Sequence, residues 1–193
     1  MPWQKQFDVD DALSKAMHAF WARGYEATSM QDLVDCMGIN RGSLYATFGD
    51  KRSLFVQAVR RYDTVHREAW VASLATSAVP RDAIVSVFRD VVASVIETGS
   101  RDGCMLVNTA LELSPHDSEI ADIVSHGLTE MERFFRRMIE KGQAQGDIAA
   151  RIDAVETARA LLGLFIGLRV LSRSRPEEAL LRSITHQAEA LLS

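Results

Sequence analysis

Residues 28–48 read TSMQDLVDCMGINRGSLYATF, and this stretch decides the fold that we expect. Ser29 is followed three positions later by Asp32, a spacing similar to the capping box that begins a helix. Asn40 is a favourable N-cap for a second short helix. Two short helices joined by a turn that contains Gly38 have the arrangement of a DNA-reading helix pair.

A small apolar cluster would fix the angle between these two helices. Its members lie on the first helix, in the turn and on the second helix, and they are Leu33, Val34, Met37, Ile39, Leu44 and Phe48. We expect Cys36 to be buried beside them as a small hydrophobic residue.

The polar residues of this stretch that would face outward suit a DNA duplex. In such a pair the N-terminal turn of the second helix enters the major groove. Its residues here are Asn40, Arg41, Gly42 and Ser43. Arg41 can pair with a guanine edge or with a phosphate. Gly42 costs roughly 1 kcal/mol of helix propensity relative to alanine, which a close approach of the backbone to DNA would explain.

Further residues are candidates for phosphate contacts, because hydroxyl groups, ammonium groups and the free amides of a helix N-terminus all favour an anion. These candidates are Thr28, Ser29, Tyr45 and Lys51. The net charge of −4 hides a local excess of cations, since residues 41–62 hold five basic side chains and a single acidic one, Asp50. Such a basic surface suits a phosphate-contacting module, although a solvated helix face or a purely structural hairpin would also explain it.

The rest of the chain also favours helices, because apolar residues recur at the helical period and the prolines fall between the periodic segments. The fold class we predict is therefore all-α. The expected helices are at about 8–23, 29–37, 40–48, 51–70, 81–98, 104–113, 117–144, 153–174 and 176–192.

The last two expected helices favour a subunit interface. Residues 160–171 are apolar almost all round the helix, which requires burial on more than one side. Gly163 and Gly167 would let another helix approach closely. The alternative is that these helices only close the core of the domain. The candidate interface residues are Leu162, Phe165, Ile166, Leu180, Ile184 and Leu191.

Residues 12–59 resemble the DNA-binding domain of TetR-family regulators. The resemblance is strongest in GYEATSMQDL (24–33), GINRGSLYATF (38–48) and DKRSLF (50–55). It implies a three-helix N-terminal domain, residues 1–50, whose third helix reads the groove. It also implies a larger helical domain, residues 51–193, that binds a ligand and dimerises through its last two helices. The same pattern assigns phosphate contacts to Thr28, Ser29, Tyr45 and Lys51, and groove positions to Arg41, Gly42 and Ser43.

The stretch GCMLVNTALE, residues 103–112, is the most distinctive one in the second half of the chain. Cys104, Asn108 and Glu112 would share one helix face and could line a pocket. Cys104 would begin a helix beside Arg101, an environment that favours a reactive thiolate. The spacing Gly-Cys-x-x-x-Asn-x-x-x-Glu resembles a subset of the TetR family, some members of which sense electrophiles through cysteine. The alternative is that Cys104 is a packing residue and that the other two fasten helices together.

The other walls of a pocket would be mostly apolar, because hydrophobic side chains form most of the lining of ligand sites. The candidates are Trp70, Phe88, Val92, Met105, Leu111, Val124, Leu128 and Phe165.

Together these patterns predict a dimeric transcriptional regulator, in our interpretation a repressor, that binds a palindromic double-stranded DNA operator and is released by a small-molecule effector. Two distant cysteines and the lack of an apolar leader or spanning stretch favour the cytoplasm and no membrane contact. We expect no catalytic residues, no metal and no cofactor. Two alternatives stay open: a thiol-based redox or electrophile sensor acting through Cys104, and a helical small-molecule-binding protein or enzyme whose helix pair is only structural.

Overall fold

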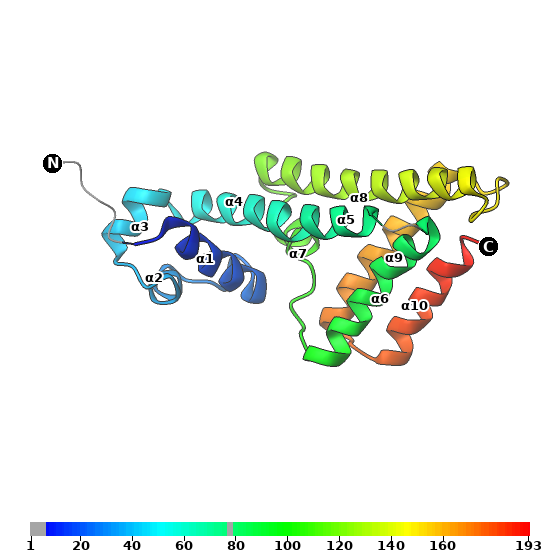
Figure 1. Cartoon of the computed structure of the whole chain (residues 1–193). Helices are drawn as coiled ribbons and strands as arrows, with labels where there is room; N and C mark the ends of the chain where they lie inside the picture. Colours follow the sequence, from blue (N-terminus) through cyan, green and yellow to red (C-terminus); the bar gives the residue numbers. More distant parts are fainter. Residues whose placement is uncertain (1–6, 77–78) are drawn as a thin grey trace.

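The computed structural model describes residues 7–76 and 79–193, and in these ranges every regular element is a helix. The predicted all-α fold is confirmed. Figure 1 shows an elongated molecule, with α1, α2 and α3 at one end and α4 leading from them into a larger helical body. The elements are α1 (Val9–Arg23), α2 (Met30–Met37), α3 (Arg41–Phe48), α4 (Lys51–Tyr62), the π-helical segment η1 (Asp63–Glu68), α5 (Ala69–Ala75), α6 (Pro80–Thr98), α7 (Met105–Glu112), α8 (Ser118–Gln145), α9 (Ala154–Ser174) and α10 (Glu178–Ala190).

Local capping signals set the ends of the first three helices, as the sequence predicts. The side chain of Asp8 accepts hydrogen bonds from the first backbone N–H groups of α1. Ser29 and Asp32 form a complete capping box at the start of α2. Asn40 Oδ1 accepts from the N–H of Ser43, 2.8 Å away, and so caps α3. These bonds satisfy donors that a helix start otherwise leaves unpaired.

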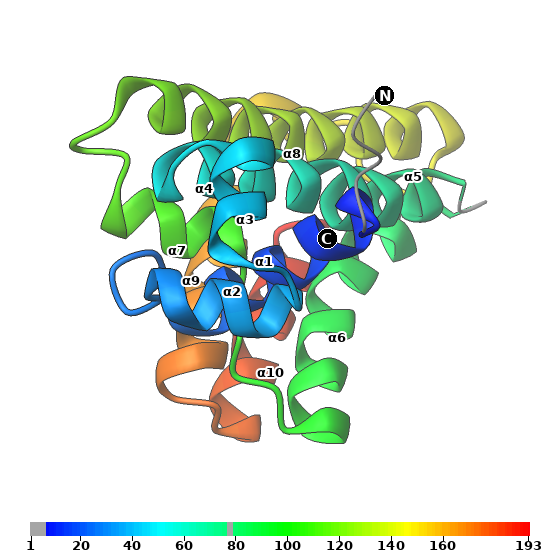
Figure 2. The same cartoon turned by 90° about the vertical axis from the view of Figure 1, so that its left-hand side faces the viewer.

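The N-terminal helices share a core that continues into the body. Phe20, Leu33, Leu44 and Leu54 are buried in it together with Leu106 of α7. A helix-turn-helix end that shares its core with the body moves less independently than one held by a linker alone. Figure 2, with this end toward the viewer, shows α2 and α3 in front of the other helices.

The prediction that Cys36 is buried in this core is wrong, because Cys36 is exposed. Leu33 and Met37, one turn apart on α2, take the inward face of the helix. Cys36 is rotated by about 100° from Met37. Its sulfur lies near the Leu33 carbonyl oxygen, at 3.4 Å, rather than among apolar side chains.

The long helix expected at 51–70 is interrupted by the π-helical segment η1. The Asp63 carboxylate and the Arg67 guanidinium form an ion pair there, and both side chains are about nine-tenths buried. The segment carries His66 between Tyr62 and Trp70, and all three side chains border the interior of the body. Widened turns of this kind occur mostly inside α-helices and often at functional sites.

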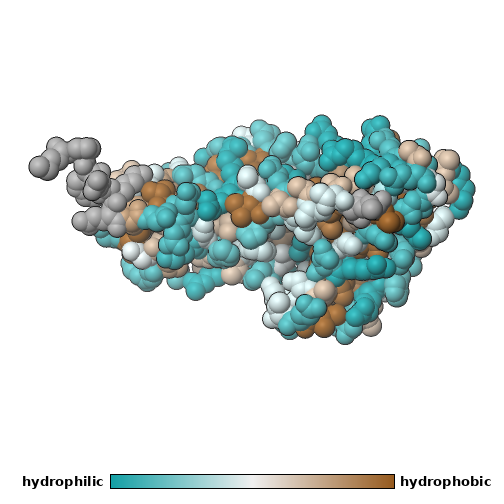
Figure 3. Space-filling view, in the orientation of Figure 1, coloured by the Kyte–Doolittle hydropathy of each residue, from teal (hydrophilic) through white to brown (hydrophobic). Residues whose placement is uncertain are grey.

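The body is a bundle of α6, α8, α9 and α10 with a second apolar core. Phe88, Phe134, Phe135 and Leu161 are completely buried in it. On the face drawn in Figure 3, hydrophobic residues form scattered patches among hydrophilic ones. The prolyl ring of Pro80 occupies the first position of α6, where its missing N–H is not needed.

The turn after α8 offers a test of this packing. A Cβ atom on Gly142 would stand 2.7 and 2.8 Å from two side-chain carbons of Ile148, which is buried. We expect Gly142→Ala to lower the free energy of unfolding by about 1–3 kcal/mol, because the buried Ile148 side chain would have to shift to make space for the new methyl group. Urea unfolding followed by circular dichroism at matched protein concentration measures the change.

Ser125→Ala is the control for this prediction, since Ser125 is exposed in the middle of the same helix. It should change the free energy of unfolding by less than about 0.5 kcal/mol. A Gly142→Ala protein at least as stable as the wild type would contradict the packing described here.

Candidate nucleic-acid interface and ligand cavity

The N-terminal turn of α3 lies at the surface, where a duplex could reach it. Asn40, Arg41 and Gly42 are all exposed. A Cβ atom on Gly42 would stand 3.3 Å from the capping oxygen of Asn40, so a larger residue would press on the cap. The capping geometry of α3 therefore explains a glycine at this position, in addition to the predicted close approach of the backbone to DNA.

Two predicted contact residues are turned inward. Thr28 is completely buried, and its hydroxyl donates to the carbonyl oxygen of Gly24 at 2.6 Å. The prediction that Thr28 contacts phosphate is therefore wrong, because this hydroxyl closes the turn between α1 and α2. Ser43 is only 8% exposed, which leaves little of its side chain for a groove contact.

The remaining predicted phosphate contacts lie at the surface. Tyr45 is 47% exposed. Ser29 is exposed, although its hydroxyl donates to the Asp32 carboxylate at 2.6 Å. The Lys51 ammonium stands 4.3 Å above the centre of the Tyr25 ring, and this cation–π contact orients it. Sequence reasoning missed Tyr25 because its partner lies 26 positions away.

Polar contacts join the α1–α2 turn to the body. The Glu112 carboxylate accepts from the backbone N–H groups of Tyr25 at 3.0 Å and Glu26 at 2.8 Å. The Arg173 guanidinium donates to the carbonyl oxygens of Trp21 at 3.3 Å and Ala22 at 3.1 Å. The end of α1 is thus bonded to both α7 and α9.

The predicted pocket roles of Asn108 and Glu112 are corrected by these contacts. Glu112 bonds the α1–α2 turn, and Asn108 donates to the carbonyl oxygen of Asp102 at 3.0 Å. Neither side chain lines the cavity between α1 and the body. Asn108 and Glu112 lie on the same helix face as Cys104. Their side chains, however, bind backbone groups of other segments instead of bordering the cavity. The alternative reading of both as fasteners fits the structure.

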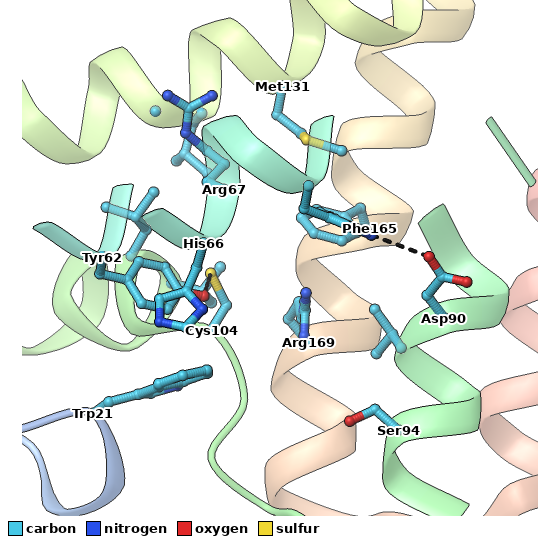
Figure 4. A pocket seen from close by; sticks show the side chains of 16 residues that line it. Trp21, Tyr62, His66, Arg67, Asp90, Ser94, Cys104, Met131, Phe165 and Arg169 are labelled. Atoms are coloured by element: carbon cyan, nitrogen blue, oxygen red, sulfur yellow. Dashed lines mark hydrogen bonds between the residues drawn. The ribbon is translucent and has the colours of Figure 1, made fainter. Parts of the chain in front are cut away.

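A cavity of about 310 Å³ lies between α1 and the body. Figure 4 shows its labelled walls, with Trp21 from α1 on one side and Phe165 and Arg169 from α9 on another. Its polar and charged lining residues are Tyr62, His66, Arg67, Asp90, Ser94, Cys104 and Arg169. Its apolar and aromatic lining residues are Trp21, Trp70, Val91, Leu106, Val107, Gly127, Leu128, Met131 and Phe165.

Four of the eleven predicted pocket residues border this cavity. Trp70, Cys104, Leu128 and Phe165 line it. Apart from Asn108 and Glu112, five others do not border it. Phe88, Met105 and Val124 are buried in the cores, Val92 lines a separate groove between α6 and α10, and Leu111 is 73% exposed. The structure therefore does not place Phe88, Val92, Met105, Leu111 or Val124 in the lining of this cavity.

Aromatic and sulfur contacts organise one wall of the cavity. The Tyr62 hydroxyl donates to Cys104 Sγ at 3.5 Å. Burial, with the nearby Cys104 as the second cause, raises the pKa of the Tyr62 phenol, so this hydroxyl keeps its proton. His66 stacks on the Tyr62 ring at 5.3 Å between centroids, and burial lowers the pKa of its imidazole. Both rings are therefore neutral near pH 7.

No sequence pattern predicts Trp21 and Arg169 as cavity residues. Trp21 belongs to the helix-turn-helix end, and its ring lies 4.9 Å from the Tyr62 ring, centroid to centroid. Arg169 lies within residues 160–171, whose mostly apolar sequence predicts a buried helix. Only the folded arrangement of α1, α4 and α9 brings these side chains together.

The outer face of α9 is open in the single chain. A Cβ atom on Gly163 or Gly167 would meet no atom within 4 Å. Of the predicted interface residues, Leu162, Leu180 and Ile184 are half-buried and Leu191 is exposed. Phe165 is buried in the cavity wall, which leaves little of it for an interface, whereas Ile166 is half-buried and packs partly on the first core.

Between 7 and 76 and between 79 and 193, no group of histidine, cysteine and acidic side chains is placed to hold a metal ion. In the same ranges, the helices are too short or too polar to cross a membrane.

Two family profiles match most of the chain. Residues 12–58 match the profile described as bacterial regulatory proteins, tetR family, and residues 78–187 match the one described as tetracyclin repressor-like, C-terminal domain. The HTH-type transcriptional regulator YezE of Bacillus subtilis (strain 168) is 33% identical over 144 residues, which cover 75% of this chain and 74% of YezE. The HTH-type transcriptional repressor ComR of Escherichia coli (strain K12) is 31% identical over 170 residues, which cover 88% of this chain and 81% of ComR.

A solved structure extends the similarity over the whole fold. The TetR family transcriptional regulator CifR, in a cysteine-substituted form complexed with 26-bp double-strand operator DNA, superposes with a TM-score of 0.86. The two chains are 31% identical, and the match covers 99% of this chain and 100% of that one. The chain described here belongs to the TetR family of bacterial transcriptional regulators.

Proposed function

We propose that this regulator is a dimeric repressor that binds a palindromic operator through α3 and is released by a small molecule in the cavity. One observation carries the proposal: the cavity is lined both by Trp21 of the helix-turn-helix end and by residues of the body. An occupant would therefore touch both parts at once. ComR and BdcR of Escherichia coli (strain K12), two relatives of this chain, are named as repressors, and CifR was solved on operator DNA.

Operator reading would divide between two groups of residues. Arg41 is exposed at the first position of α3, from which it can reach base edges in the major groove. Tyr45 and Lys51 would contact phosphates, which fix the position of the protein on the duplex without reading its sequence. A twofold dimer would place two α3 helices about 34–36 Å apart, on successive major-groove faces.

Release would follow from the position of the cavity at the junction. A ligand can weaken operator binding only if it binds the released conformation more tightly than the DNA-bound one. The π-helical segment η1 continues directly from α4 and contributes His66 and Arg67 to the wall. A ligand that pushes on this segment or on Trp21 would therefore change the orientation of α1 and α4 relative to α9.

The interface we propose uses the outer faces of α9 and α10. Gly163 and Gly167 leave a shallow stripe on α9, into which a helix of a second copy could settle closely. Leu180, Ile184 and Leu191 of α10 would border this stripe together with Leu162. Burial of that surface would supply the apolar area that a stable dimer needs.

The thiol-sensor alternative places the switch at Cys104. Its sulfur does border the cavity, but the residue is buried and accepts a hydrogen bond from Tyr62. Reactive cysteines are generally accessible and lie in electropositive surroundings. The packing observed here favours a non-covalent effector.

Arg41→Ala and Lys51→Ala should separate the two reading roles. We expect Arg41→Ala to lose about 1–3 kcal/mol of discrimination between the operator and a mutated sequence. Lys51→Ala should weaken binding to every duplex. It should also reduce the slope of the logarithm of the binding constant against the logarithm of the salt concentration by about the amount of one phosphate contact. Fluorescence anisotropy over a salt series, with an operator selected from a random DNA pool, measures both.

The control for these two variants is Arg136→Ala, which removes an exposed arginine of α8. It should leave affinity, discrimination and salt dependence as in the wild type. Unchanged binding by both Arg41→Ala and Lys51→Ala would contradict the proposed roles.

Gly163→Met should convert the dimer to a monomer. The side chain has open space in the single chain but would occupy the stripe that a second copy needs. We expect sedimentation to show a monomer at concentrations where the wild type is dimeric, with unchanged helix content by circular dichroism. Ser125→Met, on an exposed position of α8, should remain dimeric. A dimeric Gly163→Met protein would place the interface elsewhere.

Cys104 should be protected from alkylation, and this tests the thiol alternative. In a Cys36→Ser background, which removes the exposed thiol, we expect N-ethylmaleimide to react slowly and to leave operator binding intact. Mass spectrometry and anisotropy measure the two effects. Prompt release from Cys36→Ser, but not from Cys36→Ser with Cys104→Ser, would instead support a thiol sensor.

A further inference from the structure

Two hydrogen-bond donors at the cavity are buried without a partner. Trp21 Nε1 and Arg169 Nε are inaccessible to solvent, and neither makes a hydrogen bond to any part of the chain that the structure describes. Both residues line the cavity. Figure 4 shows them on different walls, with the space of the cavity between them. Buried donors are nearly always paired in folded proteins, so two orphans at one cavity need an explanation.

The charge of the cavity points the same way. Arg67 is neutralised by Asp63, with which it forms two hydrogen bonds. Asp90 accepts from the indole N–H of Trp70 at 3.1 Å and lies at the exposed edge of the cavity. Within residues 7–76 and 79–193, Arg169 has no carboxylate within salt-bridge distance. Arg169 is therefore a cation of the lining without an ion-pair partner, and Asp90, at the exposed edge, is a carboxylate that forms no ion pair there either.

Aromatic rings hold the Arg169 guanidinium in place. Its central carbon lies 5.3 Å from the centre of the Phe165 ring and 5.6 Å from that of Trp70. Such contacts orient the planar group but use none of its N–H donors. The guanidinium is therefore preorganised to bind an acceptor that comes from outside the chain.

We propose that the effector is a small monocarboxylate with an apolar body. This inference rests on the proposed function and names the chemical class of its ligand. The carboxylate would accept hydrogen bonds from Arg169, and a small rotation of the Trp21 ring, whose indole nitrogen is covered here, would let Trp21 donate to the same ligand. The apolar body would lie against Leu128, Met131 and Phe165. A single, delocalised negative charge suits this cavity better than a phosphate dianion, because mostly apolar walls penalise strongly hydrated charges.

The position of the two donors connects ligand binding to the junction. Trp21 belongs to α1, whereas Arg169 belongs to α9. An acceptor held by both would tie the helix-turn-helix end to the body at a fixed separation. Any operator-bound conformation that needs another separation would then be disfavoured.

Matched ligand pairs test the proposal on the full-length, DNA-free protein. We would titrate cinnamate, indole-3-acetate and phenylacetate, and the primary amide of each, by isothermal calorimetry. At least one carboxylate should bind about tenfold or more tightly than its amide, the effect expected of one charge-assisted hydrogen bond. Arg169→Met should abolish this preference, and Trp21→Phe should weaken carboxylate binding while keeping an aromatic ring.

Thermal unfolding without ligand distinguishes a binding role from a structural one. Arg169→Met removes an unpaired buried donor, so its Tm should equal or exceed that of the wild type. Carboxylate should raise the Tm of the wild type but not that of Arg169→Met. The control, Arg136→Met on the exposed face of α8, should keep both the preference and the ligand-dependent rise in Tm.

Several outcomes would overturn the proposal. These are no binding by any of the three carboxylates, equal binding by their amides, a carboxylate preference that survives Arg169→Met, or a Tm of Arg169→Met several degrees below that of the wild type. Because calorimetry uses DNA-free protein, these outcomes are separate from a failure of operator binding, which would contradict the proposed function alone.

Discussion

The end of α1 leaves backbone groups unpaired, and the body of the molecule supplies their partners. A helix that ends at Gly24, with φ at 89°, cannot bond its last carbonyl groups or the N–H groups of the following turn internally. Arg173 takes two of the carbonyl oxygens, and Glu112 takes two of the N–H groups. The orientation of the helix-turn-helix end relative to the body depends on these contacts, because breaking them would leave partly buried polar groups without partners.

The same junction explains why the cavity lies where it does. Bonds at the end of α1 hold Trp21 opposite α9, and the π-helical segment turns His66 and Trp70 toward the space between them. A fully packed junction would be more stable but would have no room for an effector. The cavity and the buried Asp63–Arg67 pair beside it therefore resemble a site kept open for function at some expense of stability.

Sequence patterns predicted what depends on near neighbours. The caps at Asp8, Ser29 and Asn40 each act over two or three positions, and the structure has all of them. Sequence patterns failed where the hydrogen-bond partner of a side chain is far away in the sequence or is a backbone group. The inward turn of Thr28 depends on the carbonyl of Gly24, and Glu112 bonds residues more than eighty positions earlier. The π-helical turn at 63–68 has no sequence signature that we recognise.

Arg169 shows most clearly how much of the site depends on tertiary packing. On a helix that reads as apolar nearly all round, an arginine would ordinarily be placed at a solvated position or in an ion pair. Here its guanidinium lies against two aromatic rings with one buried N–H unpaired. Removing the partner of such a group is costly, whereas replacing the group by an apolar side chain of similar length is not. Stability alone would therefore favour methionine at this position, and a charged residue there is best explained by a ligand that pairs with it.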